Sequence, residues 1–291
     1  MNINPLLTHR HENYLYMLNL ELNAATLAQF SGVRYVVMQG SANRTQAFAR
    51  QLATTILNIN PNYFTPLDLT PTSHYSSYRV ANILMVSHGM GNTSILGLLQ
   101  DLTKLLYYAG NTQLEYIRVG TSGGIGLEAG SVVVTQQAYM PDLSPFYLMP
   151  SLAKTIQVPT NFNLALSQRI ISAQPGLPFK LILGNSIAAD DFYLGQARFD
   201  GALNHQHSHA EQQAYFARAQ ALNICNFEME STAMAAFCNR VNIPATMIAV
   251  TLLNRLLGDQ ISATPEQLNE YSARSQLVTT NYLLSQEDID C

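Results

Sequence analysis

The sequence ILMVSHGMGNTSILGLL, at residues 83–99, joins a short apolar run to a helical pattern through a glycine-rich turn. Residues 83–87 are mostly apolar and too few for a typical helix, so they predict a buried strand. After the turn, residues 92–94 offer helix caps, and leucine and isoleucine recur at helical spacing until Gly110. A buried strand that leads through a turn into a helix is the repeating unit of an α/β fold.

The same alternation of strands and helices extends along the rest of the chain. We predict further buried strands at residues 33–38, 115–119, 131–137, 180–187 and 244–253, and helices at 44–59, 162–173, 210–222, 230–241 and 265–285. Strands separated by helices favour a three-layer α/β/α sandwich around a mostly parallel sheet. No repeat, low-complexity tract or linker divides the sequence. We therefore expect a single domain that spans residues 1–291.

The composition excludes several classes of function. The 291 residues include 15 basic and 19 acidic side chains, which give a net charge of −4 and no attraction for nucleic acid or an anionic membrane. No apolar run reaches the roughly 18 residues of a membrane span, and the N-terminus lacks the layout of a signal peptide. The sequence has three cysteines, an odd number, and no two of them form a CxxC motif: Cys225, Cys238 and Cys291. We expect a soluble cytoplasmic protein without a disulfide framework.

Three glycine-rich turns follow predicted strands, at residues 40–44, 89–91 and 120–124. In open α/β sheets, ligands bind at the carboxyl ends of the strands, where glycines let backbone N–H groups approach an anion. Arg44 and Arg118 lie beside two of these turns, and guanidinium groups bind phosphate oxygens in pairs. The pattern predicts a small phosphate site. The alternative is a set of tight turns whose arginines point into solvent.

The third turn also matches the G-x-S-x-G elbow of serine hydrolases, with Ser122 as the nucleophile. Residues 88–91 could then supply an oxyanion loop, and Asp190 and His205 follow in the order of a catalytic triad. An elbow requires a helix after the turn, whereas residues 131–134 read as a strand. The serine hydrolase therefore remains the less favoured alternative.

Two further segments carry polar groups suited to a nucleoside. Gln196 and Arg198 could read the edge of a planar heterocycle while Phe192 stacks on its face. Glu228 and Glu230 precede an apolar helix, where ribose hydroxyls would be suitable partners for a carboxylate. The alternatives are a solvated loop for the first segment, and for the second a helix-start carboxylate that interacts with the helix dipole.

The remaining candidates favour ordinary structural roles. His205, His207 and His209 alternate as metal ligands on a strand might, but their polar neighbours are typical of a loop that enters a helix. Cys225 and Cys238 are interpreted as thiols of the apolar core. We therefore expect no metal site.

Five motifs, taken together and in order, resemble the nucleoside phosphorylases. They are VSHGMGNTSI at residues 86–95, IRVGTSGGIG at 117–126, DFYLGQARFDG at 191–201, EMES at 228–231 and VTLLNRL at 250–256. The Gly-Gln-x-Arg element at residues 195–198 is similar to that of eukaryotic-type uridine phosphorylases. The resemblance covers roughly residues 30–285. It implies the nucleoside phosphorylase fold, in which the central sheet of the sandwich is mixed.

The resemblance also implies roles for individual residues. It assigns phosphate to Gly40, Arg44, Arg118 and Thr121; ribose to Met229 and Glu230; and uracil to Phe192, Gln196 and Arg198, with Arg255 near the O4 edge and Gly123 beside the substrate. Arg118, Gln196, Arg198 and Glu230 are the catalytic residues on this reading. Purine-specific relatives have an aspartate as general acid after the strand that here ends in Leu252-Leu253-Asn254. That acid is absent from this chain, which is consistent with a pyrimidine leaving group.

The chain departs from the family pattern at three places. Family members complete the phosphate site with an arginine from the partner subunit, and the corresponding residue here is His74. Their N-terminal histidine, which reaches the ribose 5′-hydroxyl of the partner, has only Tyr16 or His11 nearby. Ala189 replaces a hydroxyl residue beside the uracil loop. Sites shared in this way imply a homodimer, with residues 1–30 as an N-terminal arm at the subunit interface.

The function implied is reversible phosphorolysis of uridine to uracil and ribose 1-phosphate in pyrimidine salvage. Inorganic phosphate is a substrate, and no cofactor is needed. The alternatives are a catalytically weak homologue that binds nucleosides or bases, and the hydrolase acting through Ser122.

Overall fold

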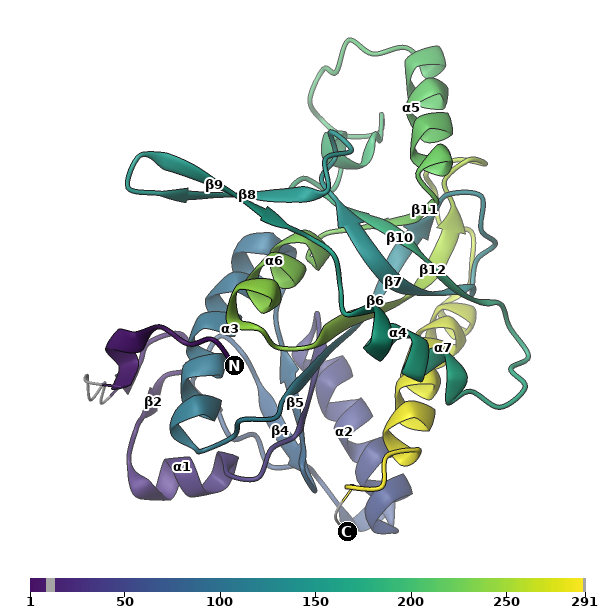
Figure 1. Cartoon of the computed structure of the whole chain (residues 1–291). Coiled ribbons are helices and arrows are strands. Elements are labelled where there is room, and N and C mark those ends of the chain that lie inside the picture. Colours follow the sequence, from purple (N-terminus) through teal and green to yellow (C-terminus); the bar gives the residue numbers. More distant parts are fainter. Residues whose placement is uncertain (9–13, 290–291) are drawn as a thin grey trace.

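The computed structural model of the chain describes residues 1–8 and 14–289. Its main sheet has eight strands in the order β11-β10-β7-β12-β6-β3-β5-β4 (Figure 1). These strands are β3 (Tyr35–Gln39), β4 (Ser77–Val80), β5 (Ile83–Ser87), β6 (Glu115–Gly124), β7 (Val132–Tyr139), β10 (Leu181–Ala188), β11 (Ile224–Glu228) and β12 (Ala245–Asn254). Two hairpins form separate two-stranded sheets: β1 (Tyr14–Leu15) with β2 (Leu20–Glu21), and β8 (Phe146–Ser151) with β9 (Lys154–Pro159).

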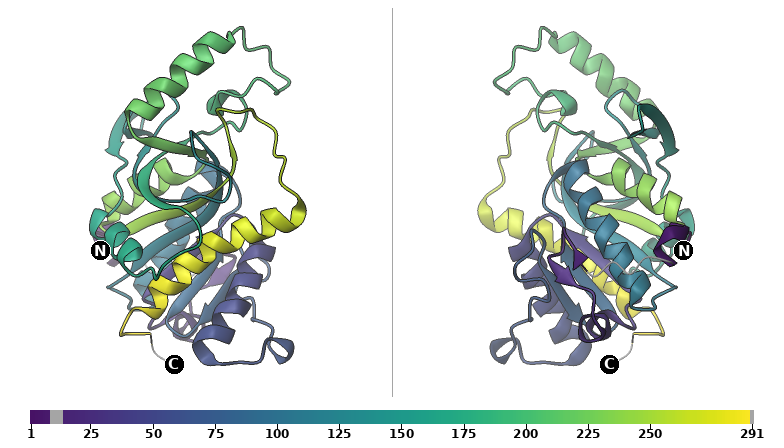
Figure 2. Two further views of the ribbon diagram at one scale, coloured as in Figure 1. Left: turned by 90° about the vertical axis from the view of Figure 1, so that its right-hand side faces the viewer. Right: turned by 90° about the vertical axis from the view of Figure 1, so that its left-hand side faces the viewer.

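Helices cover both faces of the main sheet (Figure 2). One face packs against α2 (Ala42–Leu57), α4 (Leu164–Ser172) and α7 (Pro265–Leu284), and the other against α1 (Ala24–Phe30), α3 (Gly91–Tyr108) and α6 (Ser231–Val241). The remaining long helix, α5 (His209–Ala221), packs on β11. Short 3₁₀ turns are η1 (Pro5–Thr8), η2 (Pro61–Tyr63) and η3 (Leu194–Gln196). The predicted three-layer α/β/α sandwich is confirmed.

The sheet is mixed, as the family resemblance implies. β3 pairs in parallel with β5 and β6, β6 with β12, and β10 with both β7 and β11. The pairs β7–β12, β4–β5 and β6–β11 are antiparallel. The β6–β11 pairing also joins the end strand of the sheet to its middle, so that β6, β12, β7, β10 and β11 form a closed ring of strands.

The predicted turn at residues 120–124 is wrong, because β6 continues through it to Gly124. Gly123 and Gly124 pair with Phe227 and Asn226 of β11. A Cβ at Gly124 would lie 3.0 Å from the Leu127 oxygen and 3.1 Å from the Leu253 oxygen, so only glycine allows the strands to approach so closely. The glycines therefore allow the strand to continue and to pair with β11 instead of ending it.

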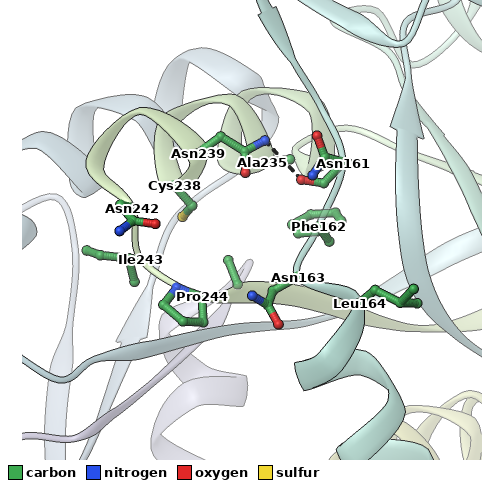
Figure 3. A pocket seen from close by; sticks show the side chains of 11 residues that line it. Asn161, Phe162, Asn163, Leu164, Ala235, Cys238, Asn239, Asn242, Ile243 and Pro244 are labelled. Atoms are coloured by element: carbon green, nitrogen blue, oxygen red, sulfur yellow. Dashed lines mark hydrogen bonds between the residues drawn. The ribbon is translucent and has the colours of Figure 1, made fainter. Parts of the chain in front are cut away.

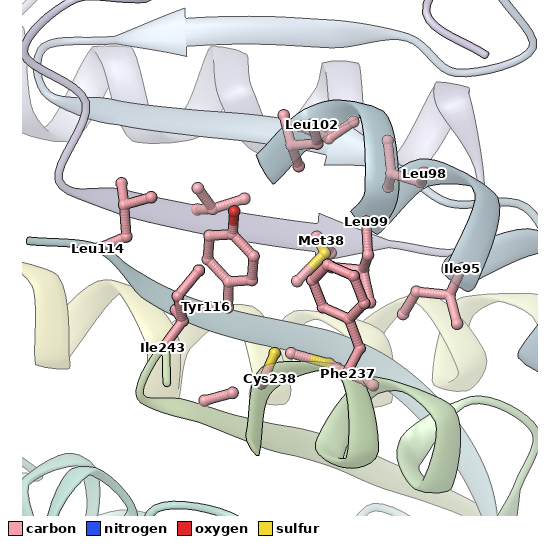
Figure 4. Close-up of a cluster of buried hydrophobic side chains, with 14 of the residues drawn as sticks. Met38, Ile95, Leu98, Leu99, Leu102, Leu114, Tyr116, Phe237, Cys238 and Ile243 are labelled. Atoms are coloured by element: carbon pink, nitrogen blue, oxygen red, sulfur yellow. The ribbon is translucent and has the colours of Figure 1, made fainter. Parts of the chain in front are cut away.

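The strands are buried on both faces, which explains their uninterrupted apolar runs. Within β3, Tyr35 and Val37 pack on the α2 and α7 side, whereas Val36 and Met38 pack on the α3 and α6 side. On the α3 and α6 side, Leu99 of α3 packs in the same core cluster as Phe237 and Cys238 of α6 (Figure 4).

Every strand and helix named from the sequence is present within a few residues of its predicted bounds. Some helices and strands lie outside the ranges predicted from the sequence, and these are short or exposed. They are α1, β1, β2, β4, β8, β9 and β11. The β8–β9 hairpin turns through Leu152 and Ala153, both at positive φ (49° and 61°), without the Asn-Gly or Asp-Gly pair that usually marks such a turn. Its residues are largely exposed, so they show no buried apolar run.

The N-terminal segment packs on its own chain. Leu15 and Leu18 are buried in the core on the α3 side, and the Asn2 backbone N–H donates to the Val241 oxygen at the end of α6. The place of this segment at a subunit interface stays a prediction. No helix in the described ranges is both long and apolar enough to cross a membrane.

We expect Leu99→Ala to lower the free energy of unfolding by about 2–5 kcal/mol, because it leaves a cavity where α3 and α6 meet the sheet. Urea denaturation measures this change. Leu67→Ala, at a leucine that is 78% exposed, is the control and should change stability by less than about 0.5 kcal/mol. Equal effects of the two substitutions would contradict the packing described here.

Candidate active site

A cavity of about 320 Å³ opens at the carboxyl ends of β3, β6, β11 and β12. It is the position at which α/β sheets bind ligands. Every residue to which the family resemblance assigns a substrate or catalytic role lines it except His74. The lining residues are Gly40, Ser41, Arg44, Gly89, Met90, Arg118, Gly120, Thr121, Ser122, Gly123, Phe192, Gln196, Arg198, Phe227, Glu228, Met229, Glu230, Leu252, Leu253, Arg255 and Ile261.

One end of the cavity is built for an anion. Helix α2 begins after Gly40, with Ser41 as its cap, and α3 begins at Gly91, so two helix N-termini lie beside it. The turns before these helices are close, since a Cβ at Gly40 would lie 3.3 Å from the Gly89 oxygen. Partial burial, together with the charge of Arg118, lowers the pKa of Arg44. A phosphate at this end would relieve that repulsion between guanidinium groups.

Arg118 is buried between two carboxylates, Glu228 at the end of β11 and Glu230 just after it. Its Nη1 lies 3.1 Å from Glu228 Oε2, and its Nη2 forms an ion pair with Glu230. Glu228 also accepts from the Glu230 and Ser231 N–H groups at the start of α6, and Glu230 accepts from the Gly91 N–H at the start of α3 (2.6 Å). Both carboxylates therefore act as helix-start groups here. Burial raises the pKa of the Glu228 carboxyl, and Arg118 opposes that rise.

Residues 92–94 do not cap α3, contrary to the sequence prediction. The helix begins before these residues, at Gly91 after Met90, and the Glu230 carboxylate takes the place of a local cap. The Asn92 side chain reaches across instead, where it accepts from the Ala233 N–H of α6 and donates to Asp190. A cap supplied from 139 residues away leaves no local sequence signal.

His88 is fully buried against Arg118 and was not predicted as a site residue. Arg118 Nε donates to His88 Nε2 over 3.3 Å, so that ring nitrogen must be the unprotonated acceptor. Burial, and then the charges of Arg118 and Arg44, lower the pKa of His88 well below its ordinary range. The imidazole is therefore neutral and orients the Arg118 guanidinium.

The other end of the cavity offers donors to a planar ring. Gln196 ends η3, and its backbone oxygen accepts from Arg255 Nη2 (2.9 Å). The Arg198 guanidinium carbon lies 4.6 Å from the centroid of the Phe192 ring. Arg255 is held by Asp259 (2.6 Å) and lies over the Phe227 ring. This end of the cavity therefore combines an aromatic face with amide and guanidinium donors.

Residues 34–283 match the family model described as the phosphorylase superfamily. The chain belongs to the phosphorylase superfamily. Uridine phosphorylase 1 of Mus musculus is 36% identical over 282 residues, which cover 96% of this chain and 90% of the relative. The uridine and thymidine phosphorylase of Caenorhabditis elegans is 32% identical, over 90% of this chain and 87% of its own length. A crystal structure of uridine phosphorylase from Schistosoma mansoni in complex with uracil matches with a TM-score of 0.92 at 29% identity, and covers 99% of this chain and all of that one.

In this member of the phosphorylase superfamily, Ser122 does not form a nucleophile elbow. It lies within β6, donates to the Val250 oxygen (3.2 Å) and accepts from Asn226 (3.0 Å). Asp190 pairs with Asn92, and His205 stacks on Phe199 with ring centroids 4.0 Å apart. The three members of the predicted triad thus have separate partners.

His74 does not line the cavity of its own chain. It lies exposed on the loop before β4, between Ser73, which donates to the Met17 oxygen, and Tyr75, which donates to the Ser94 oxygen. Tyr16 is also exposed, and His11 lies outside the described residues. Ala189 is buried, and its N–H donates to the Glu228 oxygen.

Several lining residues were missed by the sequence analysis, among them Leu252, Leu253 and Ile261. Their apolar side chains carry no chemical signature. Leu252 and Leu253 could have been found from position, because they end a predicted strand at the edge where ligands bind. Ile261 lies beyond that strand in a loop, for which position gives no such guide.

The other candidates lie away from this cavity. No group of three or more metal-binding side chains is placed to hold an ion within residues 1–8 and 14–289. Cys225 and Cys238 are buried free thiols, as predicted, and Cys291 lies outside the described residues. A second cavity, of about 310 Å³, lies at the other end of β12 and is lined by four asparagines and no charged side chain (Figure 3). It therefore lacks the arginines of the candidate site.

The neutral state of His88 predicts a pH dependence of stability. Below about pH 6.5 an unfolded histidine binds a proton that the folded one does not, so acid favours unfolding. Between about pH 7.5 and pH 5.5 this term removes about 1.4 kcal/mol from the wild type but nothing from His88→Gln. The stability gap between the two proteins, measured by denaturant unfolding, should shrink by that amount.

Phe48→Leu, at a buried residue that does not titrate, is the matched control. Its stability gap from the wild type should be the same at both pH values. A gap for His88→Gln that is also independent of pH would show that His88 binds a proton as readily in the folded protein as in the unfolded one, and is not held neutral by its surroundings.

Proposed function

We propose that the chain is a uridine phosphorylase that converts uridine and phosphate reversibly into uracil and ribose 1-phosphate. One observation carries this proposal. A single cavity holds Arg44 and Arg118 beside two helix N-termini at one end, and Phe192, Gln196 and Arg198 at the other. A molecule that contacts both ends would pair an anion with a planar ring, as phosphate and a nucleoside do.

The proposed mechanism is electrostatic. As the glycosidic bond lengthens, positive charge develops on the ribose, and phosphate held by Arg44, Arg118 and Thr121 stabilises it before forming the new bond to C1′. Negative charge moves into the uracil ring, toward donors from Gln196 and Arg198. A preorganised donor of this kind is worth about 10²–10³ in rate. Glu230 and Met229 hold the ribose.

The leaving group fits a pyrimidine. The resemblance places the aspartate of purine-specific relatives after the strand that here ends in Asn254, and the Asn254 side-chain oxygen accepts from the Gly126 and Leu256 N–H groups, each over 3.1 Å. The residue therefore shapes a turn and has no acidic proton to give. Uracil can leave as an anion stabilised by donors, so this proposal requires no general acid at that position.

The relatives support uridine as the substrate, since those reported above are all named as uridine phosphorylases, one of them also for thymidine. We include in the proposal a cytoplasmic homodimer that acts in pyrimidine salvage without a metal or organic cofactor. His74 of one subunit would complete the phosphate site of the other, which agrees with its exposed position outside its own cavity.

The function and the role of each end of the cavity are tested by uracil release with and without phosphate. Arg118→Ala should raise the phosphate KM and lower turnover, since it removes a buried charge from the anion end. Gln196→Leu should weaken uridine binding by about 1–3 kcal/mol, because polar groups of the base would lose their partner. Phosphate affinity should survive in that variant.

Three outcomes would contradict the proposal. Uracil release that needs no phosphate would indicate a hydrolase. Uridine binding without release under either condition would indicate a binding protein. Equal loss of phosphate and uridine affinity in both variants would show that the two ends do not have separate roles.

The shared site predicts complementation between two defective subunits. We expect His74→Ala to raise the phosphate KM and to leave uracil affinity unchanged. When this variant is coexpressed with Arg118→Ala, each mixed dimer regains one intact site, so the activity should exceed the mean of the two separate variants. Activity equal to that mean would place His74 outside the site.

A further inference from the structure

The Arg198 guanidinium is held by a carboxylate that has no assigned role. Asp200 lies two residues along the chain and binds it in the two-pronged way typical of arginine and carboxylate. Arg198 Nε donates to Asp200 Oδ1 over 3.0 Å, and Nη2 donates to Oδ2 over 2.7 Å. Nη2 also donates to the backbone oxygen of Asp259 (3.0 Å).

These contacts leave Nη1 as the guanidinium nitrogen of Arg198 with no partner given by the described residues. The side chain is mostly buried and lines the cavity beside Gln196. Its guanidinium carbon lies 4.6 Å from the centroid of the Phe192 ring, and this contact further limits rotation. Asp200 therefore determines which edge of the guanidinium is turned away and which nitrogen remains for a ligand.

Asp200 also joins the two loops that form the base end of the cavity. Gln260 Nε2 donates to Asp200 Oδ2 over 3.0 Å, and the neighbouring Asp259 carboxylate binds Arg255. Arg255 in turn donates to the Gln196 backbone oxygen. Both donors of the proposed uracil site are thus held by one network that spans residues 196–200 and 255–260.

We propose that Asp200 is a positioning residue that directs Arg198 Nη1 toward the base, so that this donor stabilises the charge that develops on the leaving uracil. This inference rests on the proposed function of the site. Asp200 itself does not line the cavity. Its effect on catalysis is transmitted through Arg198.

The charge of Asp200 does not cancel that of Arg198 at the base. Asp200 occupies the Nε and Nη2 edge, and its side chain is 31% exposed, so solvent screens it from the cavity. The hydrogen bonds from Arg198 lower the pKa of the Asp200 carboxyl, which keeps it ionised and the pair intact near neutral pH.

A double-mutant cycle separates positioning from a general structural role. In Asp200→Asn one amide N–H faces the guanidinium, so the two-pronged pair is lost while the side-chain shape remains. We expect this variant to lower kcat/KM for uridine by about tenfold, less than the 10²–10³ found when a donor is removed outright. In the Arg198→Met background, the same Asp200→Asn substitution should cause no further loss.

The leaving group gives a second readout. The electron-withdrawing fluorine of 5-fluorouridine stabilises the departing base, which then depends less on Arg198. The loss caused by Asp200→Asn should be smaller for 5-fluorouridine than for uridine, and the phosphate KM should not change. The control is Glu270→Gln, which removes an ion pair to Arg274 of similar length (2.7 Å) on α7. It should leave all these constants unchanged.

The inference is overturned if Asp200→Asn causes the same loss with and without Arg198, or if uridine and 5-fluorouridine are affected equally. Failure of the proposed function would be distinguished by the wild type, which would then release no uracil in the presence of phosphate. In that case the affinity for uracil, measured by calorimetry on the same four proteins of the cycle, tests the inference. Asp200→Asn should weaken uracil binding only where Arg198 is present, and an equal loss in both backgrounds would overturn the inference.

Discussion

The buried charge of Arg118 is the constraint on which the site depends. A guanidinium without water needs compensating partners, and it obtains them from Glu228, Glu230 and His88. The same two carboxylates satisfy backbone N–H groups at the starts of α6 and α3. One cluster therefore neutralises the charge, fixes two helices relative to β6 and turns the guanidinium toward the cavity. Because each of the two carboxylates serves both functions, stability and ligand binding depend on the same atoms.

At both ends of the cavity an arginine is held by a carboxylate, but the two pairs lie at different depths. At the anion end, Arg118 is buried and its partners exclude water. At the base end, Arg198 is held by Asp200 near the surface, and Arg255 is held by Asp259. In each case a carboxylate fixes the orientation of an arginine before a ligand arrives. Preorganisation of this kind avoids the free energy of ordering a long side chain at the moment of reaction.

Most of the fold could be predicted from the sequence because the central strands are buried on both faces and read as apolar runs, as residues 83–87 do. The glycines of β6 were read as a turn, since their role depends on β11, which lies about a hundred residues away. Site residues such as Arg44 and Gln196 were recognisable from motifs. His88 and Asp200 were not, because their importance comes from contacts with arginines and not from their own spacing.

The ring of strands closed by β6 and β11 has a mechanical consequence. An open sheet can twist or splay at its free edge, whereas a closed ring must break hydrogen bonds to change its circumference. The floor of the cavity is therefore stiff. The rim of the cavity, at residues 192–200 and 255–261, can deform more easily, because irregular backbone and side-chain contacts replace the strand ladder there. We therefore expect the movements that admit a nucleoside and release its base to take place in the rim and not in the sheet.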